Sequence, residues 1–128
     1  LKKRMVEFFS MTESEKEEII NNALEAGPTI PFPNFSKLFK TWLKILATLS
    51  EEQRKELFSA YIIKISQYPQ KLITFNLDGI LEIFLTLEIN EKDIISNTIK
   101  KIINNLGEEQ KRKMMIIIPE NAKIHLKI

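Results

Sequence analysis

Residues 48–61 read TLSEEQRKELFSAY, and residues 105–118 nearly repeat them as NLGEEQKRKMMIII. In both stretches a small residue precedes two glutamates, and a basic pair follows. This order is typical of a helix start, because the Ser50 oxygen can bond the free amides and acids favour the positive end of the helix dipole. Gly107 repeats the charge pattern with a weaker cap. The repeat therefore predicts two equivalent helix starts, and it favours an architectural explanation over a shared charged contact.

The repeat also extends backwards through the preceding helix. Aligning Leu49 with Leu106 places the following pairs on one another: Leu38 and Ile95, Thr41 and Thr98, Trp42 and Ile99, Lys44 and Lys101, Ile45 and Ile102, Leu46 and Ile103. Apolar residues recur at helical spacing in both segments, which predicts one buried face for each. The predicted core positions are Leu38, Trp42, Ile45, Leu46 and Leu49 in the first helix, and Ile95, Ile99, Ile102, Ile103 and Leu106 in the second.

Further helix starts predict how the chain is organised. Thr12 to Glu15 has the form of a capping box, Ser50 to Gln53 has the same form, and Asn90 offers an asparagine cap. These starts lie 38 and 40 residues apart. They predict one all-α domain of about seven helices, with two-helix units near 12–49, 50–89 and 90–128 and an extra helix over 1–10. The layout is similar to HEAT-type helical repeats, an analogy that implies no function. An irregular helical bundle explains the same helices.

Three segments allow other structures. Strict alternation over 81–89 is compatible with a strand, although Ile80, Phe84 and Leu87 also sit at helical spacing. The C-terminal residues could form a short β-hairpin about Pro119, which equally suits the first turn of a helix. The proline-rich segment 27–34 is expected to end the preceding helix at Gly27 and then run extended, with Ile30 and Phe32 turned inward.

Composition excludes several classes of function. The chain has no cysteine, so disulfides and thiolate chemistry are excluded, and its one histidine, His125, makes a Ser-His-Asp arrangement hard to build. The net charge of +2 implies neither nucleic acid nor an anionic membrane, and no apolar run is long enough to span a bilayer. The acids cluster at helix starts. We therefore expect a cytoplasmic protein that is not an enzyme and has no catalytic residues, metal site or cofactor.

The remaining hypothesis is a non-enzymatic interaction module or small helical scaffold, which binds another protein or associates with itself. The alternative is a nucleic-acid-associated factor that uses a Lys/Arg cluster at 100–113, where Lys111 and Arg112 repeat Arg54 and Lys55. Phe32 and Phe35 form either a docking ridge or a plug over the helix pair. The candidate partner-binding residues are Phe32, Phe35, Lys37, Lys40, Lys44, Lys111, Arg112 and Lys113.

Overall fold

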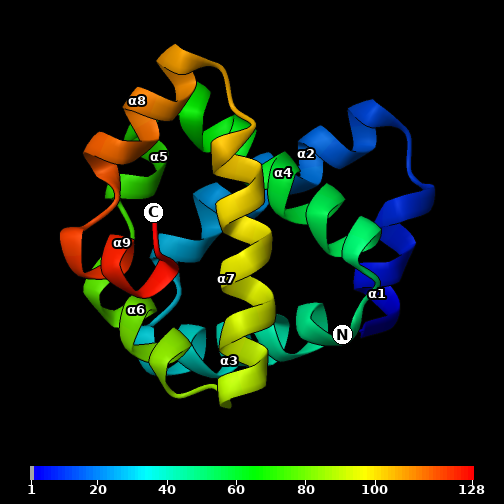
Figure 1. The fold of residues 1–128 in the computed structure, drawn as a ribbon. Helices are drawn as coiled ribbons and strands as arrows, with labels where there is room; N and C mark the ends of the chain where they lie inside the picture. The colour runs from blue at the N-terminus through cyan, green and yellow to red at the C-terminus, as the bar shows by residue number, and fades with distance from the viewer. Residues whose placement is uncertain (1) are drawn as a thin grey trace.

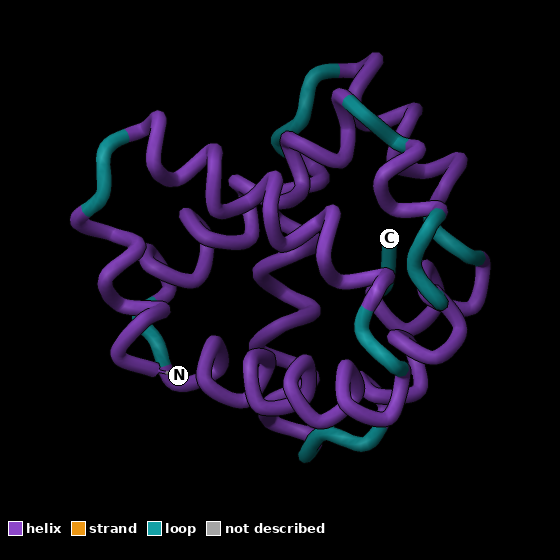
Figure 2. Tube along the Cα trace, turned by 180° about the vertical axis from the view of Figure 1, so that it is seen from behind, coloured by secondary structure: helices purple, strands orange, loops and turns teal. Residues whose placement is uncertain are grey.

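The computed structural model describes residues 2–128, and all regular structure in that range is helical (Figures 1 and 2). The helices are α1 (Lys2–Glu7), α2 (Glu13–Ala26), α3 (Phe32–Thr48), α4 (Glu51–Gln67), α5 (Gln70–Ile73), α6 (Leu77–Leu85), α7 (Ile89–Asn104), α8 (Glu108–Ile117) and α9 (Glu120–Leu126), with 3₁₀ turns at Phe8–Ser10 and Gly27–Thr29. The predicted all-α class is confirmed. The helices outnumber the seven expected because the four-residue α5 lies between α4 and α6 and because α9 follows α8 in the third predicted unit.

Helix α7 lies at the centre of the fold, and α3, α4, α8 and α9 pack against it (Figure 1). Helix α4 also contacts α2, α5 and α8, while α3 contacts α6. The large side chains with least exposure are Leu46 of α3 and Ile95 and Ile103 of α7, so the core is centred between these helices. The inward positions predicted for α7 are confirmed, because all five are buried or half-buried.

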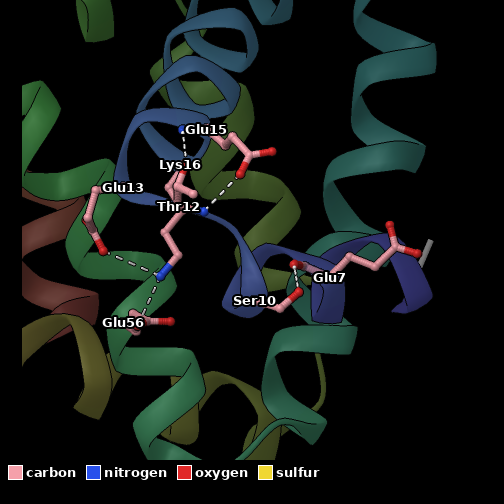
Figure 3. A network of polar contacts seen from close by, with 7 residues as sticks. All are labelled: Glu7, Ser10, Thr12, Glu13, Glu15, Lys16 and Glu56. Atoms are coloured by element: carbon pink, nitrogen blue, oxygen red, sulfur yellow. Dashed lines mark hydrogen bonds and ion pairs between the residues drawn. The ribbon is translucent and has the colours of Figure 1, made fainter.

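Local cap chemistry explains several helix starts. At α2, the Thr12 amide donates to Glu15 Oε1 at 3.0 Å and the Glu15 amide donates to Thr12 Oγ1 at 3.2 Å, which is the predicted capping box (Figure 3). At α4, Ser50 accepts from the Gln53 amide, but the Gln53 side chain makes no bond back to the Ser50 amide, so only half of the predicted capping box forms. The predicted Asn90 cap is wrong: Glu88 caps α7 and forms a capping box with Glu91.

Ion pairs join α2 to its neighbours across the surface. Lys16 lies between Glu13 of its own helix and Glu56 of α4, at 3.7 and 3.5 Å (Figure 3). Two further pairs are Glu17–Lys64 at 2.8 Å and Glu25–Lys71 at 3.8 Å. Such surface pairs stabilise by at most about 1 kcal/mol each. They therefore favour one register of α2 on α4 and α5 and contribute little to the total stability.

The proline-rich segment differs from its predicted structure. Helix α2 does end before Gly27, but residues 27–29 form a 3₁₀ turn and α3 already begins at Phe32. Both Pro28 and Pro33 occupy the first positions of a helical turn, where the fixed φ of proline suits the helix and its missing N–H is not needed. The prediction of an extended segment was therefore wrong.

The two possible strand segments are also helical. Residues 77–85 form α6, which begins at the Asn76 cap, where Asn76 Oδ1 accepts from the Gly79 amide at 3.0 Å. The C-terminal hairpin was wrong, because Pro119 caps α9 instead of turning a hairpin. None of the helices in residues 2–128 combines the length and the apolar content needed to cross a bilayer.

Candidate functional site: the open face of helix α3

The buried side of α3 carries a row of aromatic side chains. Phe35 stacks on Phe39 with ring centroids 5.4 Å apart, and Phe39 stacks on Trp42 at 5.7 Å. Trp42 then meets Phe58 and Tyr61 of α4 edge-on, at 5.7 and 5.5 Å, a geometry that aromatic pairs favour. Burial raises the pKa of Tyr61 to about 12. This row fixes how α3 is rotated, and thereby which residues its opposite side presents.

The opposite side of α3 is open and basic. It presents Lys37, Leu38, Thr41 and Lys44, with Ile45 half-buried at its edge. Leu38 was predicted to lie in the core, but 49% of it is exposed, because the aromatic row turns α3 so that Leu43 enters the core instead. Helix α3 contains no acidic residue, so this face combines exposed aliphatic surface with two lysines, of which Lys44 pairs with Glu91 of α7. We call residues 37, 38, 41, 44 and 45 the α3 face.

The candidate lysines of α3 differ in their surroundings. Lys37 is exposed, and Lys40 is half-buried. Lys44 Nζ lies 3.2 Å from Glu91 Oε1 at the start of α7. The pKa of the Glu91 carboxyl is lowered, first by the backbone amide of Glu88 and then by Lys44. Lys44 therefore helps to hold α3 on α7 while its side chain remains about half-exposed.

The two candidate phenylalanines lie at the start of α3. Phe32 packs so closely over Gly79 of α6 that a Cβ added to Gly79 would lie 2.3 Å from Phe32 Cζ. Phe35 is half-buried and lies 5.8 Å from Phe75 between ring centroids. Phe32 nevertheless remains 37% exposed. The contact with α6 agrees with a plug, and a role of either residue in partner binding stays a prediction.

The second basic cluster lies far from the first. Lys111, Arg112 and Lys113 belong to α8, which joins one end of α7 while α3 packs near the other end (Figure 1). Arg112 pairs with Glu109 at 3.5 Å. Lys101 nearby pairs with Glu51 of α4, and this bond lowers the pKa of the Glu51 carboxyl. The structure therefore does not bring the two candidate clusters together, and acids accompany part of the second one.

Arg54, which Lys111 repeats in the sequence, does not contribute to a basic surface, because only 8% of it is exposed. Its Nε donates to Thr98 Oγ1 of α7 at 2.9 Å, and its Nη1 donates to the carbonyls of Leu49 and Leu46 at 2.8 and 3.4 Å. No carboxylate in residues 2–128 lies within ion-pair distance of Arg54. The sequence signal for this contact was the alignment of Thr41 with Thr98 in the repeat. A hydroxyl that recurs at one position among apolar residues indicates a position where a polar contact can form.

His125 and the two glutamates with apolar sequence neighbours, Glu82 and Glu88, do not form a catalytic site. Glu82 and His125 are exposed, and Glu88 caps α7. Two open surface depressions, one along α8 and one between α2 and α5, include none of the three. Within residues 2–128, no three His, Asp or Glu side chains gather closely enough to hold a metal ion.

Comparison of the sequence with protein-family models, with curated proteins and with solved structures found no match. The candidate site therefore stands on its own geometry.

Proposed function

We propose that this protein is a non-enzymatic interaction module whose docking surface is the α3 face. The observation that carries the proposal is the exposure of Leu38 beside Lys37 and Lys44 on a helix without acids. A surface of this kind fits an amphipathic helix that places aliphatic side chains on Leu38 and Ile45 and an acidic side chain near the lysines. The partner class is therefore an amphipathic helix that carries an acidic side chain beside its apolar face.

The proposal includes the modular layout predicted from the sequence, with two-helix units near 12–49, 50–89 and 90–128. The packing of α2 on α4 and of α4 on α7 supports it, since these are the first helices of successive units, as does the packing of α3 on α6, which are second helices. Stacked helix pairs commonly bind partners along one exposed row of helices. The α3 face would be part of such a row.

The test is selection of helical peptides from a displayed library on the immobilised protein. Selected peptides should be acidic and amphipathic, and they should bind the Leu38→Lys variant about tenfold more weakly, since losing half the burial of a leucine costs about 1–1.5 kcal/mol. The matched control is Asn97→Lys, which adds the same charge at an exposed position of α7. Peptides that bind Leu38→Lys as well as the original chain would refute the proposal.

A further inference from the structure

Helices α3 and α7 are equivalent in sequence but differ in what covers one face. When Leu49 is aligned with Leu106, three positions of α3 correspond to three positions of α7: Leu38 to Ile95, Thr41 to Thr98, and Ile45 to Ile102. The three residues of α7 are 1%, 3% and 4% exposed. Their counterparts on α3 are exposed or half-buried. One face of the repeated helix is thus covered in α7 and open in α3.

The cover on α7 is helix α4, which makes two polar contacts from its first turns. Arg54 donates to Thr98 Oγ1 at 2.9 Å, and Glu51 pairs with Lys101. Thr98 in turn donates its hydroxyl hydrogen to the Ile94 carbonyl at 3.0 Å, which leaves the lone pairs of Thr98 Oγ1 free to accept from Arg54. These two contacts define one junction between a helix start and a helix face.

The repeat supplies a second residue for each of the four in this junction, but these four lie on two separate helices. On α3, Thr41 donates to the carbonyl four residues before it, that of Lys37, at 3.0 Å, just as Thr98 donates to the Ile94 carbonyl on α7. Lys44 of α3 corresponds to Lys101 of α7. On α8, Glu108 corresponds to Glu51 and Lys111 to Arg54. Among residues 2–128, neither the Glu108 nor the Lys111 side chain has a hydrogen-bond or ion-pair partner. One junction is complete within the chain, and its two halves recur apart on α3 and α8.

We propose that these two halves meet between copies of the chain, so that the start of α8 of one copy docks on the α3 face of the next. Lys111 donates to Thr41 Oγ1, and Glu108 pairs with Lys44, which is about half-exposed and also holds Glu91 of its own chain. Met115, beside Lys111 in the open depression along α8, covers Leu38. This inference rests on the proposed function, because it names the partner of the α3 face as a second copy. The contact is head-to-tail, so each copy keeps one open half and assembly continues to a ring or a fibre.

The chain has no cysteine, so single cysteines report the contact cleanly. Lys37→Cys places a thiol one turn before Thr41 on α3, and Arg112→Cys places one directly after Lys111 on α8. Both variants leave Thr41 and Lys111 intact. A short bis-maleimide should produce covalent dimers when the two variants are mixed and not with either variant alone. As the control, Asn97→Cys is used in place of either Lys37→Cys or Arg112→Cys in the mixture, and it should give no covalent dimer. Dimers from Lys37→Cys alone, or no dimers from the mixture although every thiol reacts, would overturn the inference.

Sedimentation velocity at increasing protein concentration supplies an independent readout. Lys44→Glu and Glu108→Lys should each weaken association severalfold, and an equimolar mixture should recover it, because residue 44 of one variant then faces residue 108 of the other with opposite charge. A strictly monomeric original chain, or no recovery in the mixture, would overturn the inference. If self-association fails while selected acidic helices still bind the α3 face, only this inference falls. If both fail, the proposed function falls with it.

Discussion

The guanidinium of Arg54 is stabilised by dipoles instead of by a carboxylate. The carbonyls of Leu46 and Leu49 lie at the C-terminal end of α3, where the helix dipole favours a cation. Hydrogen bonds to a charged group are each worth about 1.5–3 kcal/mol, and together they offset the cost of taking the charge out of water. Arg54 thereby joins three helices, since its Nε donates to Thr98 of α7.

Thr98→Val should destabilise the protein by about 1–3 kcal/mol, because it leaves the Nε donor of Arg54 buried without an acceptor. Valine keeps the shape of threonine, so little packing is lost. Urea unfolding measures the change. The matched control is Thr41→Val at the equivalent exposed position, which should stay within about 0.5 kcal/mol of the original chain. Equal effects at the two positions would show that Arg54 does not depend on the Thr98 hydroxyl.

Glu91 makes the stability of the fold depend on pH. Its pKa is lowered from the ordinary 4.5 by the Glu88 amide and by Lys44, so its ionised form is favoured in the folded state. The stabilisation is fully present above about pH 4.5 and is lost as the pH falls through the lowered folded-state pKa. Glu91→Gln keeps an acceptor for the capping box but removes the charge.

The difference in unfolding free energy between the original chain and Glu91→Gln should therefore be largest at neutral pH and should shrink towards pH 3. Urea unfolding at several pH values measures it. Glu82→Gln, at an exposed position of α6, is the control and should show little difference at any pH. If the difference in unfolding free energy between the original chain and Glu91→Gln stays constant with pH, the charge of Glu91 does not cause the stabilisation.

At the scale of helices, local chemistry made some features predictable and left others open. The starts at Thr12 and Ser50 could be predicted because the cap and its partner amide lie within one turn. The Asn90 cap failed because Glu88 and Glu91 offered a competing box two residues earlier. The orientation of α3 could not be read from periodicity, since Leu38 and Leu43 are both apolar and the aromatic contacts with α4 decide between them. The junction at Arg54 could not be predicted because it joins helices distant in sequence.

The contact between the starts of α3 and α6 can be tested at Gly79. Alanine is a better helix former than glycine by about 1 kcal/mol, but its Cβ would lie 2.3 Å from Phe32 Cζ and 2.8 Å from Asn76 Nδ2. Gly79→Ala should therefore destabilise the original chain, and it should destabilise a Phe32→Ala background less, because only the contact with Asn76 remains there. Thermal unfolding of the four proteins in this cycle measures the coupling. Equal effects of Gly79→Ala in both backgrounds would mean that the Phe32 ring does not restrict α6.

At the scale of the whole molecule, one continuous apolar core extends from Met5 of α1 to Met114 of α8. It includes side chains from helices of all three predicted units, so a unit removed from the others would expose much of its apolar surface. Trp42, the one tryptophan, is half-buried and packs against this core and α4. Its fluorescence therefore reports the α3–α4 contact, while far-UV circular dichroism reports every helix.

Met114→Ala distinguishes one cooperative unit from a stack whose last helices unfold separately. Met114 is the one buried residue of α8, and removing its side chain should cost about 2–5 kcal/mol. If the molecule unfolds as one unit, this change should lower the urea midpoint by the same amount when observed by Trp42 fluorescence and by circular dichroism, although the mutation is in α8 and the tryptophan in α3. Ile116→Ala, at an exposed position of the same helix, should change both midpoints little. If the midpoint falls only when observed by circular dichroism, α8 and α9 unfold before the rest, because in a stack a terminal unit depends only on its neighbour.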